Sequence, residues 1–136
     1  MDRPTTALIA DDEPAIRRLI SEILRMRGYV TSDVDDGCAA VERARAERPD
    51  VIVIDHGLPG IRGVDVLEEL KDEPATAGIP VILVTGWHDE ALEVRALGRG
   101  AHAVVHKPFD MHKFADVVDA AVIISQRNGL TRASPG

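Results

Sequence analysis

The chain has 136 residues and a mass of 14.7 kDa, which corresponds to one domain with little left over for a second. Acidic residues outnumber basic ones by 23 to 16, and the net charge of −7, with few aromatic residues, argues against direct binding of nucleic acid. The longest apolar run is five residues (120–124), which is too short to span a membrane, and residues 1–6 lack a signal-peptide core. The single cysteine excludes an internal disulfide. We therefore expect a soluble cytoplasmic domain without a membrane segment.

Short runs of β-branched and apolar residues alternate with helical patterns along the chain. Apolar residues from Ile16 to Leu24 recur at the spacing of one helix face, and Gly28 ends this first helix. The segment 56–63 holds three glycines and one proline, which predicts a loop. Strands are predicted at 7–10, 29–34, 51–54, 81–84 and 102–106, and the further helices at 38–47, 64–70, 89–97 and 110–124.

The alternation of strands and helices predicts an α/β fold. Strand–helix units of this spacing require a parallel sheet with helices on both faces, because right-handed crossovers place the helices there. Residues 1–125 then form the domain. Residues 126–136 are polar and contain Gly129 and Pro135, so we expect a C-terminal tail or linker.

Polar residues follow four of the five predicted strands. They are Asp11, Asp12, Asp55, Thr85 and Lys107. Each alone has an ordinary explanation as a helix cap, a turn residue or a solvated charge. Together they would converge at the carboxyl edge of the sheet, where open α/β folds bind ligands. Three carboxylates at one place predict a hard cation such as Mg²⁺, with the lysine and the threonine hydroxyl left for a phosphoryl group, an arrangement suited to phosphoryl transfer.

The chain resembles the receiver domains of two-component response regulators over about residues 5–125. The resemblance rests on motifs in the right order and at the right intervals. They are Asp11-Asp12-Glu13, Asp55 with Pro59 and Gly63 downstream, Thr85-Gly86, and Lys107-Pro108-Phe109. It implies the flavodoxin-like (βα)₅ three-layer sandwich, in which a five-stranded parallel sheet has the order 2-1-3-4-5. It also implies a cis bond before Pro108.

The same resemblance implies a role for each motif residue. Asp55 would accept a phosphoryl group from the phosphohistidine of a sensor histidine kinase or a histidine phosphotransfer protein. Thr85 and Lys107 would contact the aspartyl phosphate. Mg²⁺ would be held by Asp11, Asp12, Asp55 and the backbone carbonyl of Gly57. Without the metal, crowding should raise the pKa of at least one of the three acids, and Mg²⁺ should stabilise the fold.

One position departs from the receiver pattern. Receivers usually carry Tyr or Phe three residues before the lysine, whereas this chain has Val104. Strand alternation places Val104 and His106 on one face, and Val105 and Lys107 on the other. A valine cannot signal by burying a ring, so this position departs from the usual receiver switch. His106 is a weak substitute, and an ordinary edge-strand residue is the alternative.

The last predicted helix and the histidines bear on possible partners. One face of this helix is predicted to dock on the sheet, and it is formed by Met111, Phe114, Ala115, Val118 and Val122. A second apolar stripe lies beside that face and is formed by Val117, Ala120 and Ile124. The stripe is either a wider core face, or a partner or dimer surface shared with the helix at 89–97, the fourth of the predicted helices. The five histidines, at 56, 88, 102, 106 and 112, show no metal-ligand spacing and are expected to be surface or edge residues.

Three functions are compatible with this sequence. The leading hypothesis is a phosphoacceptor that is not a conventional enzyme, lacks an output domain of its own and signals by docking on an unidentified downstream protein. It could instead be a receiver cut from a larger regulator or hybrid kinase. The second hypothesis is a pseudo-receiver that is never phosphorylated, which only Val104 supports. The third, a Mg²⁺-dependent phosphatase, would need a second acid two residues after Asp55, where Gly57 stands.

Overall fold

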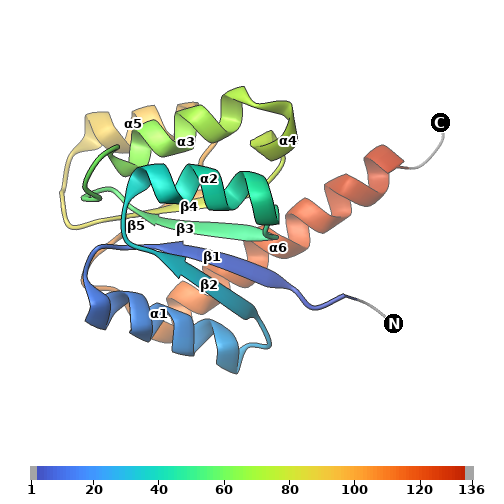
Figure 1. The fold of residues 1–136 in the computed structure, drawn as a ribbon, viewed down its shortest axis with the longest axis horizontal. Coiled ribbons are helices and arrows are strands. Elements are labelled where there is room, and N and C mark those ends of the chain that lie inside the picture. The colour runs from blue at the N-terminus through green and yellow to red at the C-terminus, as the bar shows by residue number, and fades with distance from the viewer. Residues whose placement is uncertain (1–2, 134–136) are drawn as a thin grey trace.

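The protein is described from a computed structural model that covers residues 3–133, with side chains up to residue 128. Five parallel strands form one sheet in the order β2-β1-β3-β4-β5, which confirms the predicted fold (Figure 1). The strands are β1 (Thr6–Ala10), β2 (Val30–Val34), β3 (Val51–Asp55), β4 (Val81–Thr85) and β5 (Ala103–His106). The helices are α1 (Pro14–Met26), α2 (Gly37–Glu47), α3 (Gly63–Asp72), α4 (Pro74–Ala77), α5 (Glu90–Gly98) and α6 (Met111–Ala133).

Helices cover both faces of the sheet, as the crossover argument predicts. Helices α2, α3 and α5 pack on one face, and α1 and α6 pack on the other (Figure 1). Side chains alternate between these two layers, so that Ile54 of β3 joins the first core and Val53 joins the second. Because β3 and β4 lie inside the sheet, both of their faces are buried, and this is why their sequences are continuously apolar.

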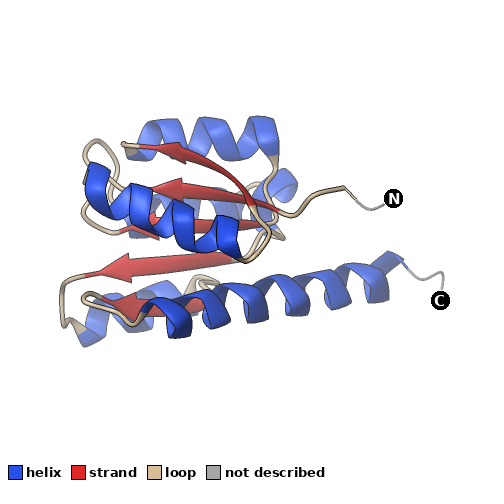
Figure 2. Cartoon of the chain, turned by 90° about the horizontal axis from the view of Figure 1, so that it is seen from below, coloured by secondary structure: helices blue, strands red, loops and turns tan. Residues whose placement is uncertain are grey.

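The last helix differs from the prediction. It was expected to end at residue 124, but α6 continues to Ala133 and runs past the edge of the sheet (Figure 2). Residues 126–133 are therefore helical, and the predicted end of the last helix at residue 124 is wrong. That residues 126–136 form a tail or linker stays a prediction. A single glycine such as Gly129 lowers helix stability by about 1 kcal/mol without having to end the helix. The domain boundary at residue 125 stays a prediction, and Pro135 lies outside the described residues.

Smaller differences concern short elements and boundaries. Helix α4 was not predicted, because four residues are too few to show helical periodicity. Helix α4 begins at Pro74, and the buried Thr76 hydroxyl donates to the Leu70 carbonyl over 2.7 Å, which fixes α4 against the end of α3.

A search of the described helices for a membrane span, which requires sufficient length and hydropathy, finds none.

Candidate functional site

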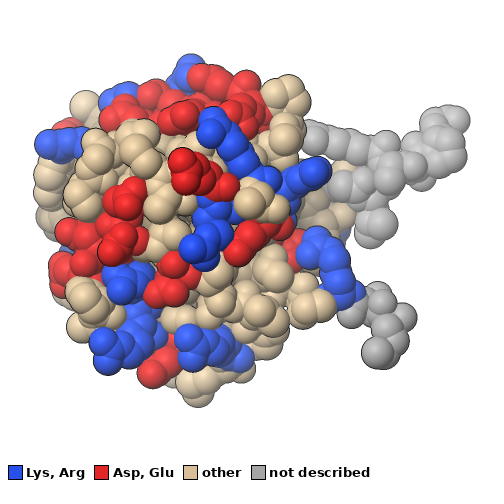
Figure 3. Space-filling model, viewed as in Figure 1, with Lys and Arg blue, Asp and Glu red and all other residues tan. Residues whose placement is uncertain are grey.

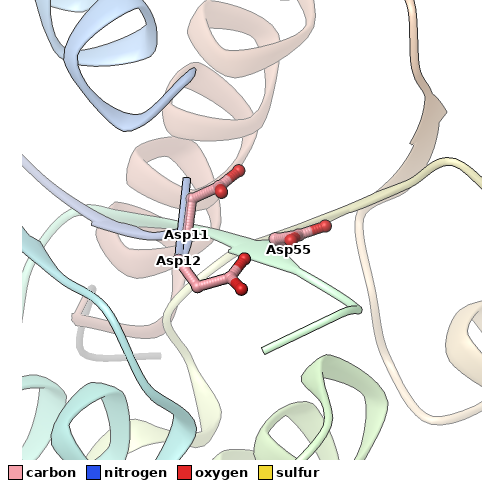
Figure 4. A group of neighbouring side chains, drawn as sticks. All are labelled: Asp11, Asp12 and Asp55. Atoms are coloured by element: carbon pink, nitrogen blue, oxygen red, sulfur yellow. The ribbon is translucent and has the colours of Figure 1, made fainter. Parts of the chain in front are cut away.

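Three carboxylates meet at the carboxyl edge of the sheet. Asp11 and Asp12 follow β1, and Asp55 ends the neighbouring strand β3 (Figure 4). One carboxylate oxygen from each lies within 4.8 Å of the others, and they are the only such group of His, Cys, Asp or Glu in the described part of the chain. Asp11 and Asp55 are buried, whereas Asp12 is exposed. Hard oxygen ligands with one open side fit Mg²⁺, which keeps several of its waters.

Local backbone interactions hold Asp11 in this position. Its Oδ1 accepts a hydrogen bond of 2.9 Å from the Glu13 amide, directly before α1 begins. Arg17 of α1 donates from Nη1 to the Asp11 carbonyl over 2.9 Å, and its Nε binds Asp33 of β2 over 2.8 Å. The end of β1 is therefore fixed to both α1 and β2.

Lys107 lies between the two buried acids. Its Nζ is 3.3 Å from Asp11 Oδ2 and 3.3 Å from Asp55 Oδ1. Burial opposes the charge of Lys107, but the carboxylates of Asp11 and Asp55 outweigh it and raise the pKa of the lysine. The bond between Lys107 and Pro108 is cis, as the resemblance implies. The lysine therefore stays charged beside Asp55, where it can pair with an anion.

One lysine does not neutralise this cluster. Burial raises the pKa of Asp11, and the charge of Asp55 raises it further, whereas the Glu13 amide and Lys107 offset only part of the effect. The pKa of Asp11 is thus raised in the expected direction, but burial contributes more to it than the crowding of the acids. An ionised Asp11 is therefore costly in the folded protein, and a bound cation would relieve that cost.

Thr85 and Gly57 complete the set of predicted residues. Thr85 is buried at the end of β4, and its hydroxyl accepts a hydrogen bond of 3.0 Å from the Trp87 amide. Gly57 lies beside the acceptor carboxylate, since a Cβ added there would stand 3.5 Å from Asp55 Oδ2. The structure thus gathers all the predicted site residues at one edge of the sheet. Their chemical roles, including that of the Gly57 carbonyl as a ligand, stay predictions.

His56 is a neighbour of the site that the sequence interpretation missed. It was expected to be a surface or edge histidine, but it is buried directly after Asp55. Its Nδ1 accepts from the Val64 amide at the start of α3 over 3.4 Å, and burial, aided by the charge of Arg62, lowers its pKa. Strand alternation places His56 on the same side as Ile54, and that signal could have identified it.

His56 also contacts the loop that follows β4. Its ring meets the Trp87 indole edge-on, with centroids 5.0 Å apart and an interplanar angle of 81°. The Arg62 guanidinium lies 5.0 Å from the centroid of the same indole. The residue after Asp55 is thus linked through Trp87 to the loop after Thr85.

The β5 alternation inferred from the sequence is confirmed. Val104 packs against the core beneath α2, α3 and α5, and Val105 packs against the opposite core. His106 faces α5, where its Nε2 is 3.7 Å from Glu93 Oε2. No ring occupies position 104, so the only ring on this face of β5 is that of His106.

The predicted apolar stripe on α6 is partly buried and partly exposed. Phe114 and Val118 are buried, as expected for the face that docks on the sheet. Val117 is half-buried against the same core, so this part of the stripe is a wider core face. Ile124 is 47% exposed, and Val94 on α5 is 71% exposed. The exposed remainder of the stripe therefore consists of Ala120 and Ile124.

Charged side chains of both signs are interspersed on the face seen in Figure 3. Arg95 of α5 binds Glu68 of α3 over 2.6 Å and Asp65 over 2.9 Å. Arg45 of α2 likewise pairs with Glu69 over 3.5 Å. Acidic residues along α3 are thus partly neutralised by arginines from both neighbouring helices.

Comparison with known proteins agrees with this geometry. A family model for the response regulator receiver domain matches residues 7–119. The chain is 37% identical over 134 residues to the probable transcriptional regulatory protein TcrX of Mycobacterium tuberculosis, covering 98% of this chain and 55% of TcrX. It is 31% identical over 115 residues to the polar-differentiation response regulator DivK of Brucella anthropi, covering 85% of this chain and 94% of DivK. The chain therefore spans about half of TcrX and nearly all of DivK.

A solved structure shares the same fold. The signal receiver domain of a signal transduction histidine kinase from Syntrophus aciditrophicus superposes with a TM-score of 0.82 at 31% sequence identity. The match covers 97% of this chain and 96% of that one.

Proposed function

The chain belongs to the family of response regulator receiver domains, and from that premise we propose that it accepts a phosphoryl group on Asp55 in a Mg²⁺-dependent reaction. The donor would be the phosphohistidine of a sensor histidine kinase or a histidine phosphotransfer protein. One observation carries the proposal: the buried Asp55 carboxylate lies 3.3 Å from Lys107 and beside two further carboxylates. The chain would thus act as a signalling domain and not as an enzyme that turns over a separate substrate.

The proposed reaction is a direct transfer between the two proteins. An oxygen of Asp55 forms a bond to phosphorus, the bond from phosphorus to the donor imidazole breaks, and its electron pair returns to that nitrogen. Mg²⁺, held by Asp11, Asp12, Asp55 and the Gly57 carbonyl, would neutralise negative charge on the phosphoryl oxygens. Lys107 would pair with one phosphoryl oxygen, and the Thr85 hydroxyl would donate to another after leaving the Trp87 amide.

Intact mass spectrometry after incubation with acetyl phosphate and Mg²⁺ tests this proposal. The wild-type chain should gain one phosphoryl group, and Asp55→Asn should gain none, because the amide cannot act as the nucleophile. Asp72→Asn, which changes an exposed acid at the end of α3 and outside the cluster, is the control and should be modified like wild type. If a folded wild-type chain gains no phosphoryl group from acetyl phosphate or from a phosphorylated histidine phosphotransfer protein, the result favours the pseudo-receiver alternative.

We further propose that the phosphorylated domain signals through protein–protein contacts, without an output domain of its own. The similarity to DivK, of which the chain covers 94%, supports this proposal. The similarity to TcrX, of which it covers 55%, supports the alternative of a receiver within a larger regulator. The downstream partner would be a protein and not nucleic acid, and location in the cytoplasm stays a prediction from the sequence.

A dimer through the surface of α5 and α6 is a second proposed contact. Val94, Leu97 and Ile124 are exposed apolar side chains on these helices. Placing a charge on this face should prevent association, so sedimentation equilibrium should show a dimer for wild type and a monomer for Ile124→Glu. Met26→Glu, at an exposed position on α1, is the control and should leave the dimer intact. A wild-type monomer at every concentration would contradict the proposal.

A further inference from the structure

Two histidines from different elements stack on each other next to the proposed site. The rings of His88 and His106 have centroids 5.0 Å apart and an interplanar angle of 6°. His106 ends β5 and lies opposite Thr85 in the register of β4 and β5. His88 lies three residues after Thr85 in the loop to α5. The stack therefore ties this loop to the neighbouring strand.

The loop between β4 and α5 is short and is held at both ends. Thr85 is buried at one end of it, and at the other end Asp89 caps α5 by accepting from the Ala91 amide over 3.0 Å. Only three residues lie between these fixed ends. Among them, Trp87 donates its amide hydrogen to the Thr85 hydroxyl over 3.0 Å. A displacement of that hydroxyl therefore reaches the Trp87 amide directly, and the residues beside it, Gly86 and His88, adjust with it.

We propose that His88 and His106 are positioning residues for Thr85. Their stack holds the loop, and through it the Thr85 hydroxyl, in the resting arrangement against the Trp87 amide. A phosphoryl group on Asp55 draws the hydroxyl away, the amide contact is lost, and the stack separates. The inference rests on the proposed function of Asp55, because the phosphoryl group there supplies the force that moves Thr85.

The same separation would carry the signal to the surface. His106 faces Glu93 of α5, with 3.7 Å between Nε2 and Oε2, so a moved imidazole changes what β5 presents to α5. Val104 has no ring with which to do this, and His106 lies two residues later on the same face of the strand. The stack thus offers this chain a ring-based link between the phosphoryl site and the α5–β5 surface.

Titration with beryllium fluoride, a phosphoryl mimic, in the presence of Mg²⁺ tests the inference. Trp87 is the only tryptophan, so its fluorescence reports the loop directly. Losing the stack removes an interaction that stabilises the resting arrangement, so His88→Ala and His106→Ala should each lower the half-saturating concentration about 2- to 10-fold. The double variant should bind no more tightly than either single variant. His106→Phe, which keeps a ring, should return the midpoint to the wild-type value.

Proton NMR of the two histidine rings provides a second readout. A control variant at another histidine shows whether the effect is specific to the stacked pair. The ring C–H signals of His88 and His106 in proton NMR should shift on saturation with the mimic, as two rings leave each other. His102→Ala is the control, because His102 is exposed and contacts no ring among the described residues, and it should titrate like wild type.

The outcomes separate this inference from the proposed function. If wild type binds the mimic and gains a phosphoryl group, but the alanine variants bind with unchanged or weaker affinity, the positioning role is wrong and the phosphoacceptor role stands. If the two alanine substitutions lower the half-saturating concentration additively in the double variant, the two histidines act independently, and the proposed role of their stack is wrong. If wild type neither binds the mimic nor gains a phosphoryl group, the proposed function fails, and the inference fails with it.

Discussion

Asp11→Asn should raise the melting temperature of the metal-free protein at neutral pH and remove most of the stabilisation that Mg²⁺ gives to wild type. The substitution deletes a buried negative charge next to Asp55 and keeps the oxygen that accepts from the Glu13 amide. Lys107 retains Asp55 as a partner at 3.3 Å. The variant therefore loses the like-charge repulsion without losing the local hydrogen bond.

The sign of the effect follows from the raised pKa of Asp11. A raised pKa means that the folded state prefers the protonated acid, so its stabilising contribution is complete below the ordinary pKa of an aspartic acid. The contribution is lost as the pH rises through the raised value. Ionised Asp11 therefore destabilises the metal-free protein at neutral pH, and the advantage of Asp11→Asn should shrink as the pH falls.

Thermal unfolding with EDTA or with Mg²⁺ measures both effects. At 100 times its dissociation constant, a ligand that binds only the folded state stabilises it by about 2.7 kcal/mol, or about 10 °C for a chain of this size. Wild type should show a gain of this order, and Asp11→Asn only a small part of it. Asp72→Asn, at an exposed acid on α3, should respond to Mg²⁺ like wild type. Equal melting temperatures of wild type with and without Mg²⁺ would contradict the acidic-site interpretation.

Gly63→Ala should destabilise the fold and impair phosphorylation together. A Cβ at Gly63 would stand 2.7 Å from the Asp55 carbonyl oxygen and 2.7 Å from the His56 Cα. These are backbone atoms and cannot rotate away, so the segment that carries the acceptor must shift. Overpacking of this kind costs about 3 kcal/mol at the upper end of its usual range, or a melting temperature lower by about 10 °C.

Gly98→Ala provides the matched control for this prediction. Gly98 ends α5, and a Cβ there would meet nothing within 4 Å. Alanine is the better helix former, so this variant should be as stable as wild type or more stable by up to about 1 kcal/mol. Chemical denaturation compares the stabilities of the two variants, and intact mass compares the initial rates of phosphoryl incorporation. A Gly63→Ala protein with wild-type stability and rate would show that the close approach is not needed.

Much of the fold could be predicted because its signals are local. The continuous apolar runs of β3 and β4 indicate strands buried on both faces, and the spacing from Ile16 to Leu24 indicates a helix face. The strand order came only from the resemblance to receiver domains, because order depends on which strands pair and periodicity carries no such information.

The alternation of strands and helices, and the polar residues at the carboxyl ends of the strands, can be recognised from the amino-acid sequence because both are short-range patterns. The contacts between side chains cannot: His56 meets Trp87, His88 stacks on His106, and Lys107 lies between two acids only in the folded chain. The length of α6, which runs on to Ala133 and not only to residue 124, also emerges from the fold. Burial, ring stacking and the pKa of Asp11 all depend on groups that are distant in the chain and become neighbours only when the sheet forms.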